Sequence, residues 1–80
     1  MNELKSVAAK EGQSATNPAW KCKICILEIP DNHYAGFSYC LAATGLTHGI
    51  EAGLTKEEAL EKCMSWANQT IPDCVFEKLN

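Results

Sequence analysis

The sequence lacks a long apolar run, and this absence excludes one class of protein. Apolar residues make up 46% of its 80 residues, yet no stretch approaches the roughly 18 consecutive apolar residues of a membrane-spanning helix. Residues 1–17 also lack the apolar block of a secretory signal, because Lys5, Lys10, Glu11 and Gly12 interrupt them. We therefore expect a cytoplasmic protein that does not contact membranes.

Clusters of basic residues are missing as well. The net charge is −3, and the lysines are scattered singly along the chain. Nucleic-acid binding needs several cations on one face, because much of its affinity comes from neutralising phosphates. We expect no direct contact with DNA or RNA, whereas an acidic surface suits a protein partner that has a basic surface.

Catalytic patterns are equally scarce. The one pair of neighbouring carboxylates, Glu57 and Glu58, is explained by the start of a helix, where the helix dipole favours negative charge. The regularly spaced glycines at 45, 49 and 53 lack the Lys-Ser/Thr ending of a phosphate-binding loop. We expect a protein that is not an enzyme.

The chain is long enough for one small domain, and a domain of this size buries only about 60 to 65% of its unfolded surface. Residues 1–19 are predicted to form a tail, or a short helix over residues 2–11 followed by a linker. Residues 20–80 are predicted to form a single α+β domain.

Residues 20–29 alternate as a strand does. The predicted core face carries Trp20, Cys22, Ile24 and Ile26, and the opposite face carries Lys21, Lys23, Cys25 and Leu27. A turn at residues 30–33 leads to a second apolar run at 34–43, in which Phe37, Tyr39 and Leu41 share a face. These two runs predict a β-hairpin.

A third strand is predicted at residues 46–52, at the sheet edge. Thr55 can then cap a helix over residues 55–68, with Glu58 reaching back to the cap. The apolar side of this helix is predicted to hold Ala59, Leu60, Cys63, Met64 and Ala67. A last strand at 74–79 completes an antiparallel sheet of three to four strands packed on one amphipathic helix, in the order β-β-β-α-β.

The five cysteines allow three interpretations, of which the first is a metal site. Cys22 and Cys25 have the spacing of half a zinc site, which three other residues would complete: Cys40, His33 and His48. An alternating strand, however, points Cys22 and Cys25 to opposite faces. The same pair beside Trp20 is similar to a thioredoxin-type redox motif, but that motif needs its first Cys at a helix N-terminus, which a strand does not provide. We therefore expect no metal and no cofactor, and a zinc-binding or thiol-active protein that uses Cys22 and Cys25 is the alternative function.

Structural disulfides are the second interpretation. They require an oxidising compartment, and the odd number of cysteines and the missing secretory signal argue against them. The third interpretation is that reduced cysteines pack as small apolar side chains, which suits Cys22, Cys40, Cys63 and Cys74. Cys25 is expected nearer the surface or on the other face of the sheet.

The segment from Tyr34 to Ala67 resembles the HicB-like antitoxin domain. The resemblance rests on the strand, the glycine turn and the stretch from Gly53 to Lys62, in which Thr55 precedes the residues Glu-Glu-Ala-Leu. It implies a truncated RNase-H-like fold that binds a protein partner. The proline-rich turn of that family is missing from residues 41–49, and so is its C-terminal DNA-binding segment.

The size and acidity of the chain are also similar to those of small phage-encoded inhibitors such as anti-CRISPR proteins, which would place it in the host cytoplasm. The predicted function is a non-enzymatic module that binds and inhibits a protein partner. Its predicted contacts are the sheet edge, which could also join two copies in a homodimer, or an acidic helix face made of Glu57, Glu58 and Glu61.

Overall fold

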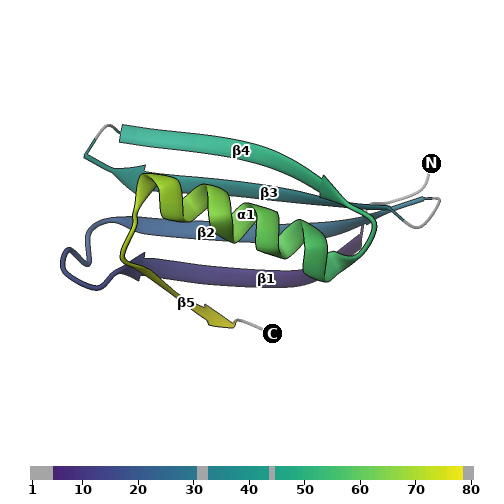
Figure 1. Cartoon of the computed structure of the whole chain (residues 1–80), viewed down its shortest axis with the longest axis horizontal. Coiled ribbons are helices and arrows are strands. Elements are labelled where there is room, and N and C mark those ends of the chain that lie inside the picture. Colours follow the sequence, from purple (N-terminus) through teal and green to yellow (C-terminus); the bar gives the residue numbers. More distant parts are fainter. Residues whose placement is uncertain (1–4, 31–32, 44, 79–80) are drawn as a thin grey trace.

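The computed structural model describes residues 5–30, 33–43 and 45–78, which form one sheet and one helix (Figure 1). The elements follow in the order β1 (Lys5–Ser14), β2 (Lys21–Ile29), β3 (His33–Ala42), β4 (Gly45–Gly53), α1 (Lys56–Thr70) and β5 (Cys74–Lys78). All four strand pairings are antiparallel, and the order across the sheet is β4-β3-β2-β1-β5. The α+β class and the antiparallel sheet are confirmed, with five strands in the order β-β-β-β-α-β.

The N-terminal segment is the main correction to the predicted fold. Residues 5–14 form strand β1, not a tail or a helix, and β1 lies between β2 and β5. Gly12 and Ser14 are buried while the residues between and beside them are exposed, which is the alternation of a half-buried strand. A helix here would leave the backbone groups of β2 and β5 without partners, so the sheet determines the conformation. The domain therefore includes most of the segment predicted to precede it.

The predicted hairpin and edge strand are confirmed. β2 pairs with β3 from Lys21↔Leu41 to Ile29↔His33, and β4 pairs with β3 alone at one edge of the sheet. The predicted turn at 30–33 includes residues 31–32, which lie outside the described residues. The last strand ends at Lys78 in the described part of the chain.

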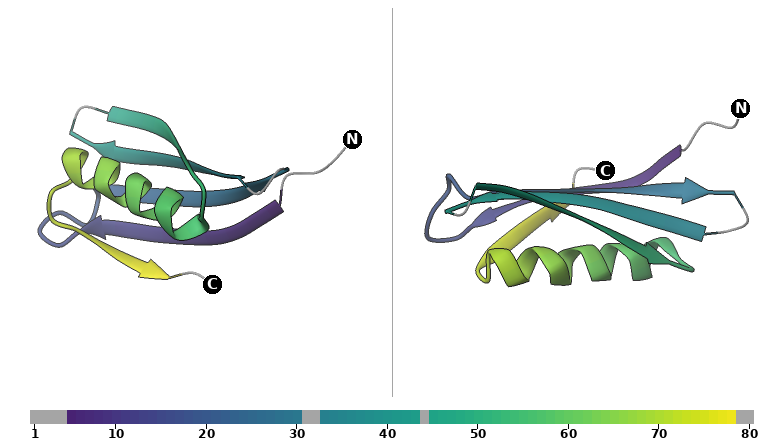
Figure 2. Two further views of the ribbon diagram at one scale, coloured as in Figure 1. Left: turned by 45° about the vertical axis from the view of Figure 1, so that its right-hand side comes forward. Right: turned by 90° about the horizontal axis from the view of Figure 1, so that it is seen from above.

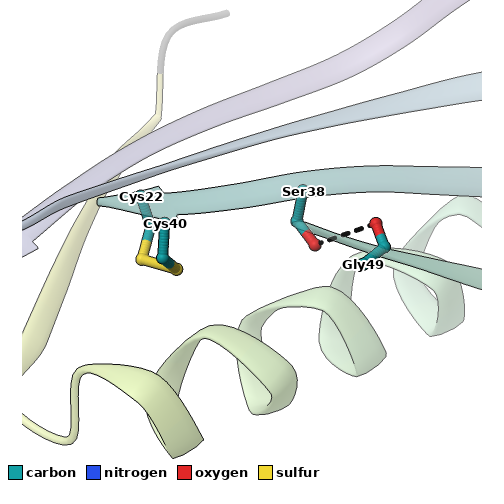
Figure 3. The surroundings of a disulfide bond; sticks show 4 residues. All are labelled: Cys22, Ser38, Cys40 and Gly49. Atoms are coloured by element: carbon teal, nitrogen blue, oxygen red, sulfur yellow. Dashed lines mark hydrogen bonds between the residues drawn. A yellow bond between two sulfur atoms is a disulfide. The ribbon is translucent and has the colours of Figure 1, made fainter. Parts of the chain in front are cut away.

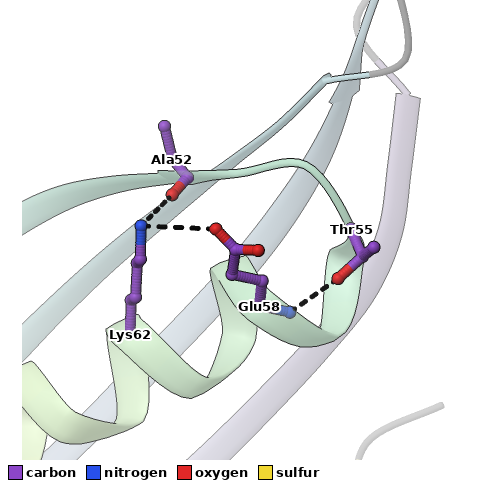
Figure 4. Close-up of polar contacts among 4 residues, drawn as sticks. All are labelled: Ala52, Thr55, Glu58 and Lys62. Carbon is purple, nitrogen blue, oxygen red and sulfur yellow. Dashed lines mark hydrogen bonds and ion pairs between the residues drawn. The ribbon is translucent and has the colours of Figure 1, made fainter.

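The predicted helix is also confirmed, with its cap. The Thr55 hydroxyl accepts a hydrogen bond from the Glu58 backbone N–H at 3.0 Å, and α1 begins at the next residue, Lys56. The carboxylate of Glu58 lies 3.5 Å from Lys62 Nζ, so within the described chain it faces Lys62 in place of the predicted return contact to the cap. Lys62 also donates to the Ala52 carbonyl at 3.0 Å, which ties α1 to the end of β4 (Figure 4).

The helix covers one face of the sheet only (Figure 2). Its buried residues are small, namely Ala59, Cys63 and Ala67, and they pack on two buried clusters of the sheet. Gly49 contributes to the close approach, since a Cβ there would lie 2.8 Å from the Trp66 indole.

None of the described residues forms a helix long and apolar enough to cross a bilayer.

Candidate functional site

The face of the sheet that α1 leaves uncovered carries large apolar side chains. We call it the open face. Seven large apolar side chains are exposed among the described residues, and five of them lie together on the open face of β3 and β4: Phe37, Tyr39, Leu41, Leu46 and Ile50. We call these five the apolar patch. Three of them, Phe37, Tyr39 and Ile50, border a shallow hollow of about 450 Å³ that also touches Cys25 and His48. Exposed apolar patches of this kind are typical of interaction surfaces.

The other half of the open face is charged and close to neutral. Lys21 and Lys23 on β2 lie directly opposite Gln13 and Glu11 on β1, and Glu11 lies opposite Glu77 on β5. Directly opposite residues of a ladder share a face of the sheet. Two lysines thus stand beside two glutamates, and the exposed Val75 of β5 lies on the same face opposite Gln13. The face therefore changes from apolar at β3 and β4 to mixed, with balanced charges, at β1 and β5.

Within the part of the chain that the structure describes, the outer edge of β4 pairs with no other strand. The Cα atoms of Cys22 and Cys40 are 4.2 Å apart, which identifies a non-hydrogen-bonded pair of the β2–β3 ladder. The backbone groups of Cys40 therefore point to Thr47 of β4, its partner in the next ladder. By alternation, the N–H and C=O groups of Leu46, His48 and Ile50 point outward from the sheet. The Ala52 carbonyl follows the same pattern, and Lys62 caps it.

The two edges of the sheet differ in their protection. β5 has five residues, two of which are the charged Glu77 and Lys78. β4 has nine residues, no proline, and a single charged residue, Glu51. Natural proteins shield their edges with short strands, charges and prolines, so β4 is the edge that remains open to another strand.

The cysteine predictions need one correction. Cys22 and Cys40 are not reduced core residues, because they form a disulfide between β2 and β3 on the face that α1 covers (Figure 3). The residues pair directly in the ladder, and the hairpin brings their Cα atoms close enough for a bridge. The sequence spacing of 18 residues gave no sign of this contact, which the register of the hairpin creates.

The predicted divergence of Cys22 and Cys25 is confirmed. Cys22 is buried under the helix, whereas Cys25 lies on the open face with its Sγ 3.5 Å from the Ser6 hydroxyl. Of the remaining zinc candidates, Cys40 is in the disulfide, His33 begins β3 and His48 lies on the open face. Nowhere in residues 5–30, 33–43 and 45–78 do three potential metal ligands gather. The structure thus separates the two thiols on which the alternative function depended.

The other two cysteines fill the core as expected. Cys63 is fully buried in α1, and burial raises the pKa of its thiol. Cys74 packs against the cluster around the disulfide, and burial, followed by the nearby charge of Asp73, raises the pKa of its thiol. A raised pKa keeps both sulfurs in the unreactive thiol form at neutral pH.

The acidic residues occupy two places. Glu57, Glu58 and Glu61 are exposed on α1, where they are available to a partner, and Glu58 is the one that approaches Lys62. Asp73 has a structural position. It accepts hydrogen bonds from the hydroxyls of Thr16 at 2.7 Å and Ser14 at 2.9 Å, and these contacts lower the pKa of its carboxyl. They fasten the segment after β1 to the start of β5.

Sequence reasoning missed the open face. It placed Phe37, Tyr39 and Leu41 on one face, which is confirmed, but did not ask which face of β2 they join. The hairpin register gives the answer, since Leu41 pairs with Lys21 and Tyr39 with Lys23. Since Lys21 and Lys23 lie on the non-core side of the strand pattern, an in-register hairpin with Leu41 and Tyr39 opposite them is the signal that indicates an uncovered apolar patch.

The chain matches no family model, no curated protein and no solved structure. The resemblance to HicB-like antitoxins and to phage-encoded inhibitors therefore stays a prediction.

Proposed function

We propose that the protein is a non-enzymatic module that binds a protein partner by strand addition at the β4 edge and thereby inhibits it. The observation that carries the proposal is the unprotected edge of nine residues, with outward backbone groups at Leu46, His48 and Ile50. Main-chain hydrogen bonds provide the affinity in such complexes, and pockets for alternate side chains provide the specificity. An extended segment of the partner would continue the sheet beyond β4.

The acidic residues of α1 support the same proposal. The contact between Lys62 and the Ala52 carbonyl places the Glu58–Lys62 side of the helix beside the end of β4. A partner strand followed by basic residues would meet the edge first and the carboxylates of α1 next. This arrangement fits an antitoxin-like or phage-inhibitor-like protein that covers a basic surface of its target.

The test of the edge replaces one outward N–H. His48→Pro removes the N–H that points away from β3, and proline is tolerated at such edge positions because no ladder hydrogen bond is lost. The matched control, His48→Ala, keeps the N–H and removes only the imidazole. We expect the proline variant to lose a partner that wild type and the alanine variant both capture from the producing cells. Equal capture by all three proteins would refute strand addition at this edge.

The test of the acidic face reverses its charge. In the variant Glu57→Lys/Glu61→Lys, both changed side chains are exposed, so the fold should be retained while a basic partner is repelled. Glu58 stays in place to preserve its contact with Lys62. Capture of the same partner should fall. The remaining capture should depend more weakly on salt concentration, because fewer carboxylates of α1 attract the basic partner. Unchanged capture would remove the acidic face from the binding surface.

The disulfide bears on where the protein works. Disulfides persist in oxidising compartments and are rare in a reducing cytosol, so the predicted cytoplasmic location would leave Cys22 and Cys40 reduced. Quenching the cells with acid, alkylating the thiols of the denatured protein and counting the modified cysteines by mass spectrometry separates the two cases. Five modified cysteines indicate a reducing compartment, and three indicate the disulfide form.

A further inference from the structure

The open face has the dimensions of a protein–protein interface. The described molecule measures 41 by 21 by 18 Å, and the sheet lies across the two longer dimensions (Figure 1). A stable interface of standard size buries about 800 Å² on each partner, which a face of 41 by 21 Å can supply. The apolar patch occupies the half of this face formed by β3 and β4, so the face has both the area and an apolar surface for association.

The distribution of charge favours a second copy of the chain as the occupant. The chain carries a net charge of −3, so two copies repel each other wherever acidic surfaces meet. The open face balances Lys21 and Lys23 against Glu11 and Glu77. The helix α1, which carries the exposed Glu57, Glu58 and Glu61, lies on the opposite side of the sheet (Figure 2). Contact through the open faces therefore keeps the acidic helices on the outside of the pair.

We infer that the open face packs against the open face of a second copy, forming a two-fold symmetric dimer in which two sheets are stacked. A dimer of this symmetry places the same surface on both sides of the contact. A two-fold axis that runs across the strands, between the sheets and over the middle of β3, keeps the full width of both faces in contact and stacks β3 on β3 and β4 on β4. An axis along the strands would either set the apolar patch on the charged half or leave that half outside the contact. Phe37, in the middle of β3, then lies near the axis.

This geometry makes a specific prediction for Cys25. Cys25 is the direct ladder partner of Phe37, so an axis over Phe37 also passes over Cys25. The two Cys25 thiols then face each other across the interface. The other free cysteines, Cys63 and Cys74, lie on the covered face and stay far from the second copy.

The first experiment measures mass in solution. Sedimentation equilibrium of the purified protein should give twice the 8.7-kDa chain mass at micromolar concentration. Ile50→Lys should raise the dissociation constant at least about tenfold, because it brings two like charges into the apolar centre. Leu54→Lys is the matched control, since Leu54 is exposed to the same extent as Ile50, 67%, but lies after β4 and outside the open face. This variant should dimerise as wild type does.

The second experiment needs no destabilising substitution. A short bismaleimide should cross-link the wild-type dimer through Cys25, and Cys25→Ser should abolish the product. A monomeric wild-type protein, a dimer that Ile50→Lys leaves intact, or a dimer without the Cys25 cross-link would each overturn the inference. A dimer that only His48→Pro disrupts would be joined at the β4 edges instead, and would overturn it too. All readouts use the purified chain, so they do not depend on the proposed partner.

Discussion

The two faces of the sheet differ in what lies against them. On one face α1 packs closely through its own small residues, such as Ala59, Cys63 and Ala67, and Gly49 of β4 lies where even a methyl group would touch Trp66. On the open face, the larger side chains Phe37 and Tyr39 remain 40% and 46% exposed. Cover by the helix decides this difference, since Ile24 and Ile26, which lie on the face that α1 covers, are fully buried. Hydrophobicity alone would have assigned the aromatic residues to the core.

The comparison is tested most strongly by the same truncation on each face. Ile26→Ala removes a side chain that is fully buried under α1, and should cost about 3 kcal/mol of unfolding free energy, through lost burial and the cavity that remains. Ile50→Ala on the open face should change the unfolding free energy of the monomer by less than about 0.5 kcal/mol. Urea unfolding at a concentration that keeps the protein monomeric measures both. Similar losses would mean that the open face is covered within one chain.

The disulfide gives the next largest expected effect. Replacing both Cys22 and Cys40 by alanine releases a cross-link between residues 18 apart, and should cost about 3 kcal/mol because the unfolded chain regains conformational freedom. Cys25→Ala on the open face is the control, with an expected change below about 0.5 kcal/mol. Both are read from thermal and urea unfolding without reductant. A double variant as stable as wild type would show that the bridge adds nothing to stability.

The close packing of α1 on β4 at Gly49 predicts a smaller loss of unfolding free energy. Gly49→Ala places a methyl group 2.8 Å from the Trp66 indole and should cost about 1 to 3 kcal/mol, because α1 and β4 have to separate. In a Trp66→Leu background the same substitution should cost clearly less, since the ring is gone. A double-mutant cycle measures the coupling. Equal costs in both backgrounds would place the strain elsewhere.

The contact between Asp73 and the segment after β1 predicts a modest dependence on pH. Hydrogen bonds from Thr16 and Ser14 lower the pKa of Asp73 in the folded state. The stabilisation is complete above the unfolded pKa of about 3.9, and is lost as the pH falls from there through the folded pKa. The urea midpoint of wild type should therefore decline over this acidic range, and Asp73→Asn should show a shallower decline. Parallel profiles would contradict the assignment.

Local patterns predicted those elements that need little tertiary context. The alternation of residues 20–29 gave β2, and Thr55 with Glu58 located the start of α1 within one residue. The N-terminal strand was missed because its pattern of small and charged residues is weak by itself. It becomes a strand because β2 and β5 supply hydrogen-bond partners on both sides.

The candidate surfaces were predictable only in part. The acidic residues of α1 and an edge strand at 46–52 followed from sequence, and both lie at the surface of the structure. The apolar patch did not follow, because a strand pattern shows which side chains share a face but not which face the helix covers. Residue spacing alone also left the pairing of the five cysteines open.

The sequence by itself determined the extended hairpin, the capped helix and the divergence of Cys22 from Cys25, since each depends on residues that are near neighbours in the chain. Tertiary structure alone decided the Cys22–Cys40 bridge, the place of β1 within the sheet and the exposure of Phe37, Tyr39 and Ile50. These features depend on register and on the single helix, which covers one side of a two-sided sheet. Contacts between distant residues become available only once the strands have paired.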